Sequence, residues 1–178
     1  MSNTGNIVRL TILLGIVTLI QVLILNNIDI IPLCNPMLYV VFLLAMPFGT
    51  KSIPMMITGF VAGLLIDVAS NTPGMHAGAC VLACYMRKYI LQLIAFRNAY
   101  KEDELPSIQG YGIVWYTKYA LMMLVVHHIF LFFVEQYDRL FLLQTVLRIV
   151  ISIGASLGLI ILFGLIAPGL TGQRYKES

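Results

Sequence analysis

Asp67 is the residue of this sequence whose type and position most clearly require a chemical partner. It lies at the end of a long apolar stretch, in the run GFVAGLLID. Inserting a carboxylate near membrane depth costs about 2–3 kcal/mol, so it needs a cation, hydrogen-bond donors or water beside it. Gly59 and Gly63 precede it at intervals of four, which places two glycines and the carboxylate on one helix face. Such a face lets a neighbouring helix approach closely, either within the chain or in a partner protein.

A second polar set, again spaced by four residues, lies in a stretch rich in Leu, Ile and Gly near the end of the chain. A polar stripe in such a helix must face protein or a wet cavity. We therefore predict that Arg148 pairs with Asp67 or, failing that, with Glu135 or Asp138. A structural role and a ligand pocket are both open for this cluster. The predicted buried polar cluster consists of Asp67, Gln144, Arg148 and Ser152.

The other reactive residue types form no catalytic or metal-binding pattern. His127 and His128 are adjacent, so on a helix their side chains point about 100° apart and cannot easily share a metal ion. The three cysteines include no CxxC, and Cys80 and Cys84 lie among small residues, where packing is the expected role. The chain has no HExxH motif and no phosphate-binding loop. We therefore expect no enzymatic activity, no metal site and no cofactor.

The composition indicates that these residues belong to a membrane protein. Hydrophobic residues make up 60% of the 178 residues and charged residues 11%, and the mean hydropathy is +0.92. A soluble domain could not bury so much apolar surface. Six spans of about 20 residues would use roughly two thirds of the chain. We expect a single all-α membrane domain over residues 1–178, a compact bundle of six transmembrane helices.

The apolar stretches predict spans at about residues 7–25, 32–48, 53–69, 75–94, 111–134 and 140–167. The second is the weakest, because its uninterrupted apolar part, Met37–Met46, is too short to cross about 30 Å as a helix. A broken or re-entrant segment is the alternative, and it would leave five spans. The first stretch is followed by no small-residue cleavage site, so we interpret it as a retained span.

The positive charges favour six spans with both termini in the cytoplasm, because Lys and Arg accumulate on the cytoplasmic side of short loops. The polar loop 97–110 then lies on that side, and five spans would break the pattern. No basic stripe for nucleic acid is present. An aromatic belt is expected at the start of the fifth span, from Tyr111, Trp115, Tyr116 and Tyr119. Nine of the eleven Lys and Arg residues fall on the cytoplasmic side: Arg9, Lys51, Arg87, Lys88, Arg97, Lys101, Lys118, Arg174 and Lys176.

The run GLLIDVASNTPGMHAG resembles a known family. It describes a Gly-rich helix that ends in Asp, a short turn with Gly, and a helix that opens with small residues. In a six-span chain of this size, the pattern resembles the rod shape-determining protein MreD family. The positions that match are Gly63, Asp67, Gly74, His76 and Ala77. Together with Gly59, they are the candidate residues for helix packing or for a partner interface.

The resemblance implies a fold similar to the substrate-binding S components of energy-coupling-factor transporters. It also implies a non-enzymatic scaffold of the bacterial cytoplasmic membrane, in the machinery for cell elongation, peptidoglycan synthesis and cell shape. Members of the family bind the bitopic, or single-span, protein MreC and work near actin-like MreB filaments and wall synthases. The competing hypothesis is an S-component-like transporter subunit, in which Asp67, His76, Gln144 and Arg148 line a pocket for a vitamin or a lipid.

Overall fold

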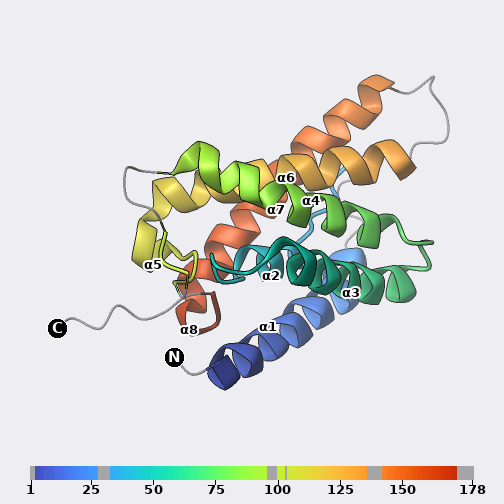
Figure 1. The fold of residues 1–178 in the computed structure, drawn as a ribbon. Helices are drawn as coiled ribbons and strands as arrows, with labels where there is room; N and C mark the ends of the chain where they lie inside the picture. Colours follow the sequence, from blue (N-terminus) through green and yellow to red (C-terminus); the bar gives the residue numbers. More distant parts are fainter. Residues whose placement is uncertain (1–2, 28–32, 96–99, 103, 136–141, 172–178) are drawn as a thin grey trace.

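The computed structural model describes residues 3–27, 33–95, 100–102, 104–135 and 142–171 (Figure 1). Within these ranges the chain is helical and contains no β-strand. Of the predicted residues, Asp138, Arg97, Arg174 and Lys176 lie outside the described part. The elements are α1 (Asn3–Leu23), the 3₁₀ helix η1 (Leu25–Asn27), α2 (Val40–Leu44), α3 (Ser52–Ser70), α4 (Met75–Ile94), α5 (Ile108–Tyr111), α6 (Ile113–Glu135), α7 (Leu142–Ile166) and α8 (Pro168–Thr171).

Five helices of the described chain are long and apolar enough to cross a membrane: α1, α3, α4, α6 and α7. They correspond, within a few residues, to five of the six predicted spans. The second predicted span is broken, as the alternative prediction had it. It contains only the five-residue helix α2, and residues 34–37 before α2 have no regular secondary structure. Pro36 and Pro47 flank the apolar stretch, and each removes a backbone N–H that a longer helix would use.

The broken segment runs back along α1 in the opposite direction. Near its start, the side chain of Gln21 donates to Pro36 O at 3.0 Å and accepts from the N–H of Leu38 at 2.8 Å. Near its end, Arg9 donates to Ala45 O at 3.0 Å. Gln21 and Arg9 lie on the same helix, roughly 18 Å apart at 1.5 Å per residue. The segment covers this distance by combining an extended stretch with the short α2.

This return explains the direction of α3. Asn26, just after α1, donates to the hydroxyl of Ser70 at the end of α3, at 2.9 Å. The helices α1 and α3 therefore finish at the same end of the bundle, and the broken segment between them supplies the return. Along the rest of the chain, α4 packs on α3 and α6, and α6 packs on α7. The short α8 contacts α1, close to the end at which α1 begins (Figure 1).

The broken segment also forms the centre of the core. Residues 37–46 are all buried, and Tyr39, Val40 and Leu43 have no exposed surface. The long helices around it expose large apolar side chains on their other sides; Val68 on α3 is 76% exposed and Leu93 on α4 is 74% exposed. An apolar outside is what lipid requires, because the bilayer core offers no water to polar groups.

The predicted aromatic belt is wrong for three of its four residues. Trp115, Tyr116 and Tyr119 are at most 4% exposed, so they face the bundle and not the lipid. Phe48 and Tyr100, which stack on each other with ring centres 4.3 Å apart, come from two connections and cover this part of α6. The indole N–H of Trp115 donates to the Tyr100 hydroxyl at 3.1 Å. The aromatic residues therefore join the ends of the helices to their connections.

The contacts of Gln21 lead to a stability prediction. Gln21→Leu should leave Pro36 O and the N–H of Leu38 unsatisfied in the core, at a cost of about 2 kcal/mol. For a chain of this size, that corresponds to a fall in Tm of roughly 4–8 °C. The measurement is thermal unfolding in a mild detergent. Gln144→Leu is the matched control, because Gln144 is exposed; equal effects of the two substitutions would contradict the role given to Gln21.

Candidate functional site

The helices α3 and α4 approach each other closely at the two glycines of the predicted face. A Cβ atom at Gly63 would lie 2.5 Å from the Cα of Ala77, and one at Gly59 would lie 2.5 Å from the Sγ of Cys84. Real Cβ atoms do not come so near a backbone atom, so glycine at position 63 is what permits this separation of the helices. Packing within the chain accounts for both glycines and for the small residues that face them.

The chain reverses between α3 and α4 through two residues with left-handed backbone conformations. Asn71 ends α3 with φ 59°, and its N–H donates to Asp67 O. The N–H of Thr72 reaches the same carbonyl at 3.0 Å. Gly74, with φ 77°, then immediately precedes α4. Glycine adopts this conformation without steric cost, and asparagine is among the few other residues that visit it routinely. The turn thus brings the start of α4 over the end of α3.

The Asp67 carboxylate closes this turn and caps α4. Its oxygens accept hydrogen bonds from the N–H groups of His76 and Ala77, at 3.0 and 2.9 Å. The Thr72 hydroxyl donates to it at 2.7 Å, and the Nδ1 of His76 lies 3.0 Å away. The first N–H groups of a helix have no partner within the helix, and its N-terminus carries partial positive charge. The carboxylate, which is 3% exposed, is therefore compensated by one helix end and two side chains.

His76 connects this cap to a buried polar chain in the core. Its ring lies edge-on to that of Tyr39, with ring centres 6.0 Å apart, and the Tyr39 hydroxyl is 2.7 Å from Nε2 of His127. The neighbouring His128 has its Nδ1 3.0 Å from a backbone carbonyl of its own helix and its Nε2 3.2 Å from the Ser156 hydroxyl. The two adjacent histidines thus have different partners, as expected from their angular separation. Tyr39 and Ser156 were not predicted as members of the site.

A cavity of about 360 Å³ opens beside the Asp67 cap, between the ends of α1, α3 and α6. Thr72 and His76 from the hairpin line it, together with Asn26, Asn35 and Glu135. These side chains offer hydroxyl, amide, imidazole and carboxylate groups at one end of the bundle. The cavity can therefore bind a small polar group through hydrogen bonds.

The predicted cluster of Asp67, Gln144, Arg148 and Ser152 is wrong as a single group. Asp67 is bound by the α3–α4 hairpin, whereas Arg148 and Ser152 both lie against Asn35. Arg148 pairs with Glu135 at 3.0 Å, one of its two alternative predicted partners, and its guanidinium lies 4.6 Å from the ring centre of Phe132. Ser152 is buried and accepts from the N–H of Asn35 at 2.9 Å, whereas Gln144 is exposed. Asp67 needs no arginine, since α4 and the turn already supply its donors.

Sequence reasoning also missed the buried side of α1. Its buried residues are spaced by four along the helix: Arg9, Leu13, Val17 and Gln21. The two polar members bind the backbone of the broken segment, and the two apolar members pack between them. The interval of four was visible in the sequence. However, Arg9 and Gln21 lie toward the two ends of an apolar stretch, and polar side chains at such positions are equally compatible with exposure to solvent. On α7, Ser152 and Ser156 show the same interval of four and serve the same segment.

Comparison with protein families, curated proteins and solved structures found no match to this chain. In the part of the chain that the structure describes, no three His, Cys, Asp or Glu side chains are grouped to hold a metal ion. The chemistry that the described residues offer at the Asp67 end is hydrogen bonding and charge compensation. The five positions on which the sequence resemblance rests all belong to the hairpin of α3 and α4: Gly63, Asp67, Gly74, His76 and Ala77.

The cap leads to a prediction for Asp67→Asn. The amide keeps the size of the side chain but loses the charge and one acceptor oxygen, so one buried N–H donor loses its partner. We expect a loss of about 2 kcal/mol, measured as a lower Tm in mild detergent. Glu135→Gln makes the same chemical change at a half-exposed ion pair and should cost under about 1 kcal/mol. A Tm for Asp67→Asn as high as that of the control would contradict the cap.

The close approach of α3 and α4 is tested by adding a single methyl group. Gly63→Ala should destabilise the protein by about 1–3 kcal/mol, because the new Cβ collides with the backbone of α4. Gly158→Ala is the control, since nothing lies within 4 Å of a Cβ there. In a helix this control substitution should be neutral or stabilising by up to about 1 kcal/mol. Thermal unfolding of the two variants gives the comparison, and similar Tm values would rule out the tight contact.

Proposed function

We propose that this chain is a non-enzymatic scaffold subunit of a bacterial cell-elongation complex, in which it binds a single-span, MreC-like protein. The observation that carries the proposal is the α3–α4 hairpin. The residues on which the family resemblance rests form one unit, held by the contact at Gly63 and the Asp67 cap. These residues are mostly buried, but they make rigid a hairpin whose outer side is exposed. A scaffold requires such a preformed surface, because it loses little conformational freedom on binding. MreB-like filaments and wall synthases are indirect partners in this proposal.

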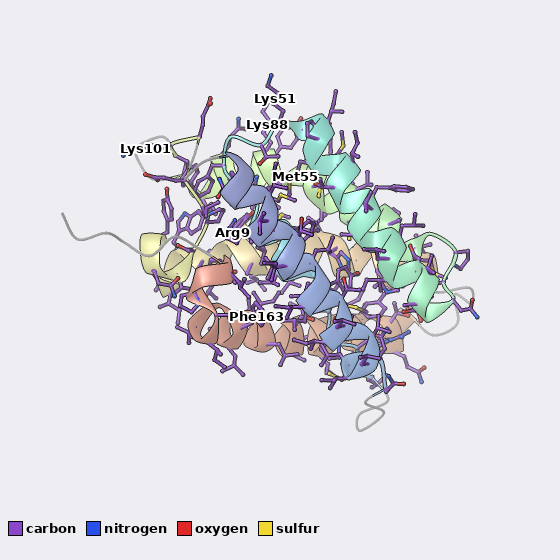
Figure 2. The ribbon with its side chains drawn as sticks, turned by 90° about the horizontal axis from the view of Figure 1, so that it is seen from below. Arg9, Lys51, Met55, Lys88, Lys101 and Phe163 are labelled. Carbon is purple, nitrogen blue, oxygen red and sulfur yellow. The ribbon has the colours of Figure 1, made fainter. Side chains whose placement is uncertain are left out.

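The charge distribution supports an orientation in the cytoplasmic membrane. Lys51, Lys88 and Lys101 gather at one end of the bundle, and Figure 2 shows them near the beginning of α1. Asp67 caps α4 at the opposite end, where α3 finishes. Since Lys and Arg accumulate on the cytoplasmic side, we infer that the hairpin turn faces outward and that both termini are cytoplasmic. The broken segment then completes a six-crossing bundle similar to the S components.

The outer side of α3 is suited to a partner helix. Phe60, Leu64 and Val68 are spaced by four and are 48%, 41% and 76% exposed. They lie on the helix that also carries the glycine face toward α4, so the same helix can pack on α4 and on a second, transmembrane helix. A single-span protein can reach this side within the bilayer, where van der Waals contact between helices replaces contact with lipid.

A second candidate function is small-molecule binding of the S-component type. The observation that favours it is the 360 Å³ cavity beside the Asp67 cap, which has polar walls. Both functions use the same end of the bundle, but they predict different molecules that copurify with the chain. A transporter subunit would keep a small molecule through gentle purification, whereas a scaffold would keep a protein.

Purification in mild detergent followed by mass spectrometry distinguishes the two functions. We expect the tagged full-length chain to retain a single-span protein of the MreC type. Leu64→Trp should lower the recovered partner about tenfold, because the larger side chain holds the two helices apart, a cost of about 1.4 kcal/mol. Leu147→Trp on α7 is the matched control, since Leu147 is 45% exposed and Leu64 is 41% exposed.

Each part of the proposal has a result that would contradict it. Recovery of a small molecule with no single-span protein would favour the transporter subunit. Turnover of a lipid-linked substrate by the purified chain would contradict a non-enzymatic role. Equal partner recovery from the Leu64→Trp and Leu147→Trp proteins would exclude the outer side of α3 as the contact.

A further inference from the structure

A larger cavity, of about 630 Å³, lies at the other end of the bundle. It is bounded by the start of α3, the second half of α4 and the connection after α4. Three cationic side chains line it, those of Lys51, Arg87 and Lys88, against one carboxylate, that of Glu102. Figure 2 shows Lys51 and Lys88 near each other at this end, with Met55 deeper along α3. The cavity is separate from the Asp67 end, so a ligand bound in it is independent of the proposed scaffold function.

Arg87 gives this cavity a fixed positive charge. It is 3% exposed and donates to the Tyr119 hydroxyl at 2.6 Å, to Met46 O at 2.6 Å and to Pro47 O at 3.2 Å. All three partners are neutral, and no carboxylate of the described chain lies within 4.0 Å of it. These bonds occupy three of the five guanidinium N–H groups. A buried cation without a counter-charge is costly, so an anion beside it would be favourable.

The two lysines add mobile charge at the rim. Lys51 and Lys88 are exposed, and neither forms an ion pair with a described residue. Lys51 also immediately precedes α3, which begins without a side-chain cap and without an acidic residue in its first turn. The partial positive charge of that helix end therefore adds to the charge of the lysines.

Apolar side chains form the deeper wall of the same cavity, among them Met55, Cys84 and Leu91. These three side chains are almost completely buried, at 1%, 2% and 8% exposed. Lysine keeps its apolar stem along apolar surface and extends its ammonium group toward the polar side, so Lys51 and Lys88 at the rim can hold a charged head above this apolar wall. A ligand that suits the cavity has an anionic head and an apolar tail.

We propose that this cavity binds an anionic phospholipid, with its phosphate between Lys51, Lys88 and Arg87 and an acyl chain along Met55 and Leu91. Phosphate offers several acceptor oxygens to these donors, and basic pockets between helices on the cytoplasmic side suit such headgroups. The lipid also counters the buried charge of Arg87. A free phosphate ion shares the head chemistry but cannot use the apolar wall.

The test uses delipidated full-length protein in detergent and native mass spectrometry. Phosphatidylglycerol and phosphatidylcholine with identical acyl chains are titrated separately. We expect phosphatidylglycerol to bind at least tenfold more tightly. The double variant Lys51→Gln/Lys88→Gln should weaken phosphatidylglycerol binding roughly 10- to 30-fold, at about 1 kcal/mol for each lysine. Arg87 is left unchanged, because its substitution would expose the carbonyl groups that it binds.

The matched control is Lys101→Gln/Lys118→Gln, which removes the same charge outside the cavity lining. It should keep wild-type affinity. Equal losses in the two double variants would overturn the proposal, because they would indicate diffuse attraction to the whole basic end. Equal binding of the two lipids would overturn it as well. Displacement of the lipid by millimolar inorganic phosphate would instead assign the site to a free anion.

Discussion

The backbone of the broken segment must be hydrogen-bonded inside the bundle, and five buried polar residues of the long helices serve this requirement. No water is present in the bilayer core, so each unpaired N–H or C=O group there costs several kcal/mol. An ordinary span satisfies these groups within its own helix, but residues 34–37 cannot. Their neighbours supply what is missing from three directions. The groups that bind the backbone between residues 33 and 47 come from Gln21, Ser152, Ser156, Arg9 and Arg87.

This constraint explains why two arginines are buried without carboxylate partners in the described chain. Arg9 and Arg87 bind three consecutive carbonyl groups, those of Ala45, Met46 and Pro47, just beyond the end of α2. The C-terminal end of a helix carries partial negative charge, so a cation placed directly after it is favourable. The arginines thus stabilise the end of a helix too short to be stable by itself. These two cationic residues, which the sequence indicated only as a topology signal, therefore also support the core.

The length of the apolar stretches predicted the long helices. The interval of four residues predicted the shared face of Gly63 and Asp67, because this interval depends only on the helix itself. The backbone partners of Asp67 lie nine and ten residues later in the chain. The left-handed conformations of Asn71 and Gly74 bring them to Asp67, and a spacing rule for a single helix does not describe such a turn. Aromatic residues at the start of α6 likewise fit an interfacial belt until their neighbours are known. The short apolar part of the second predicted span was the local signal for a broken segment, which was the alternative prediction.

The helix α4 is fixed by polar contacts at its start and in its second half, and this favours a scaffold over a moving part. At its start, Asp67 accepts from two of its N–H groups, and toward its end Arg87 binds carbonyl groups of the broken segment. Sliding α4 along its axis would break one set of contacts without forming the other. Apolar contacts can slide past one another, so they permit a helix to move during transport. Hydrogen bonds depend on distance and direction, so they oppose such a movement. The same rigidity sets the shape of both cavities, since α4 lines each of them.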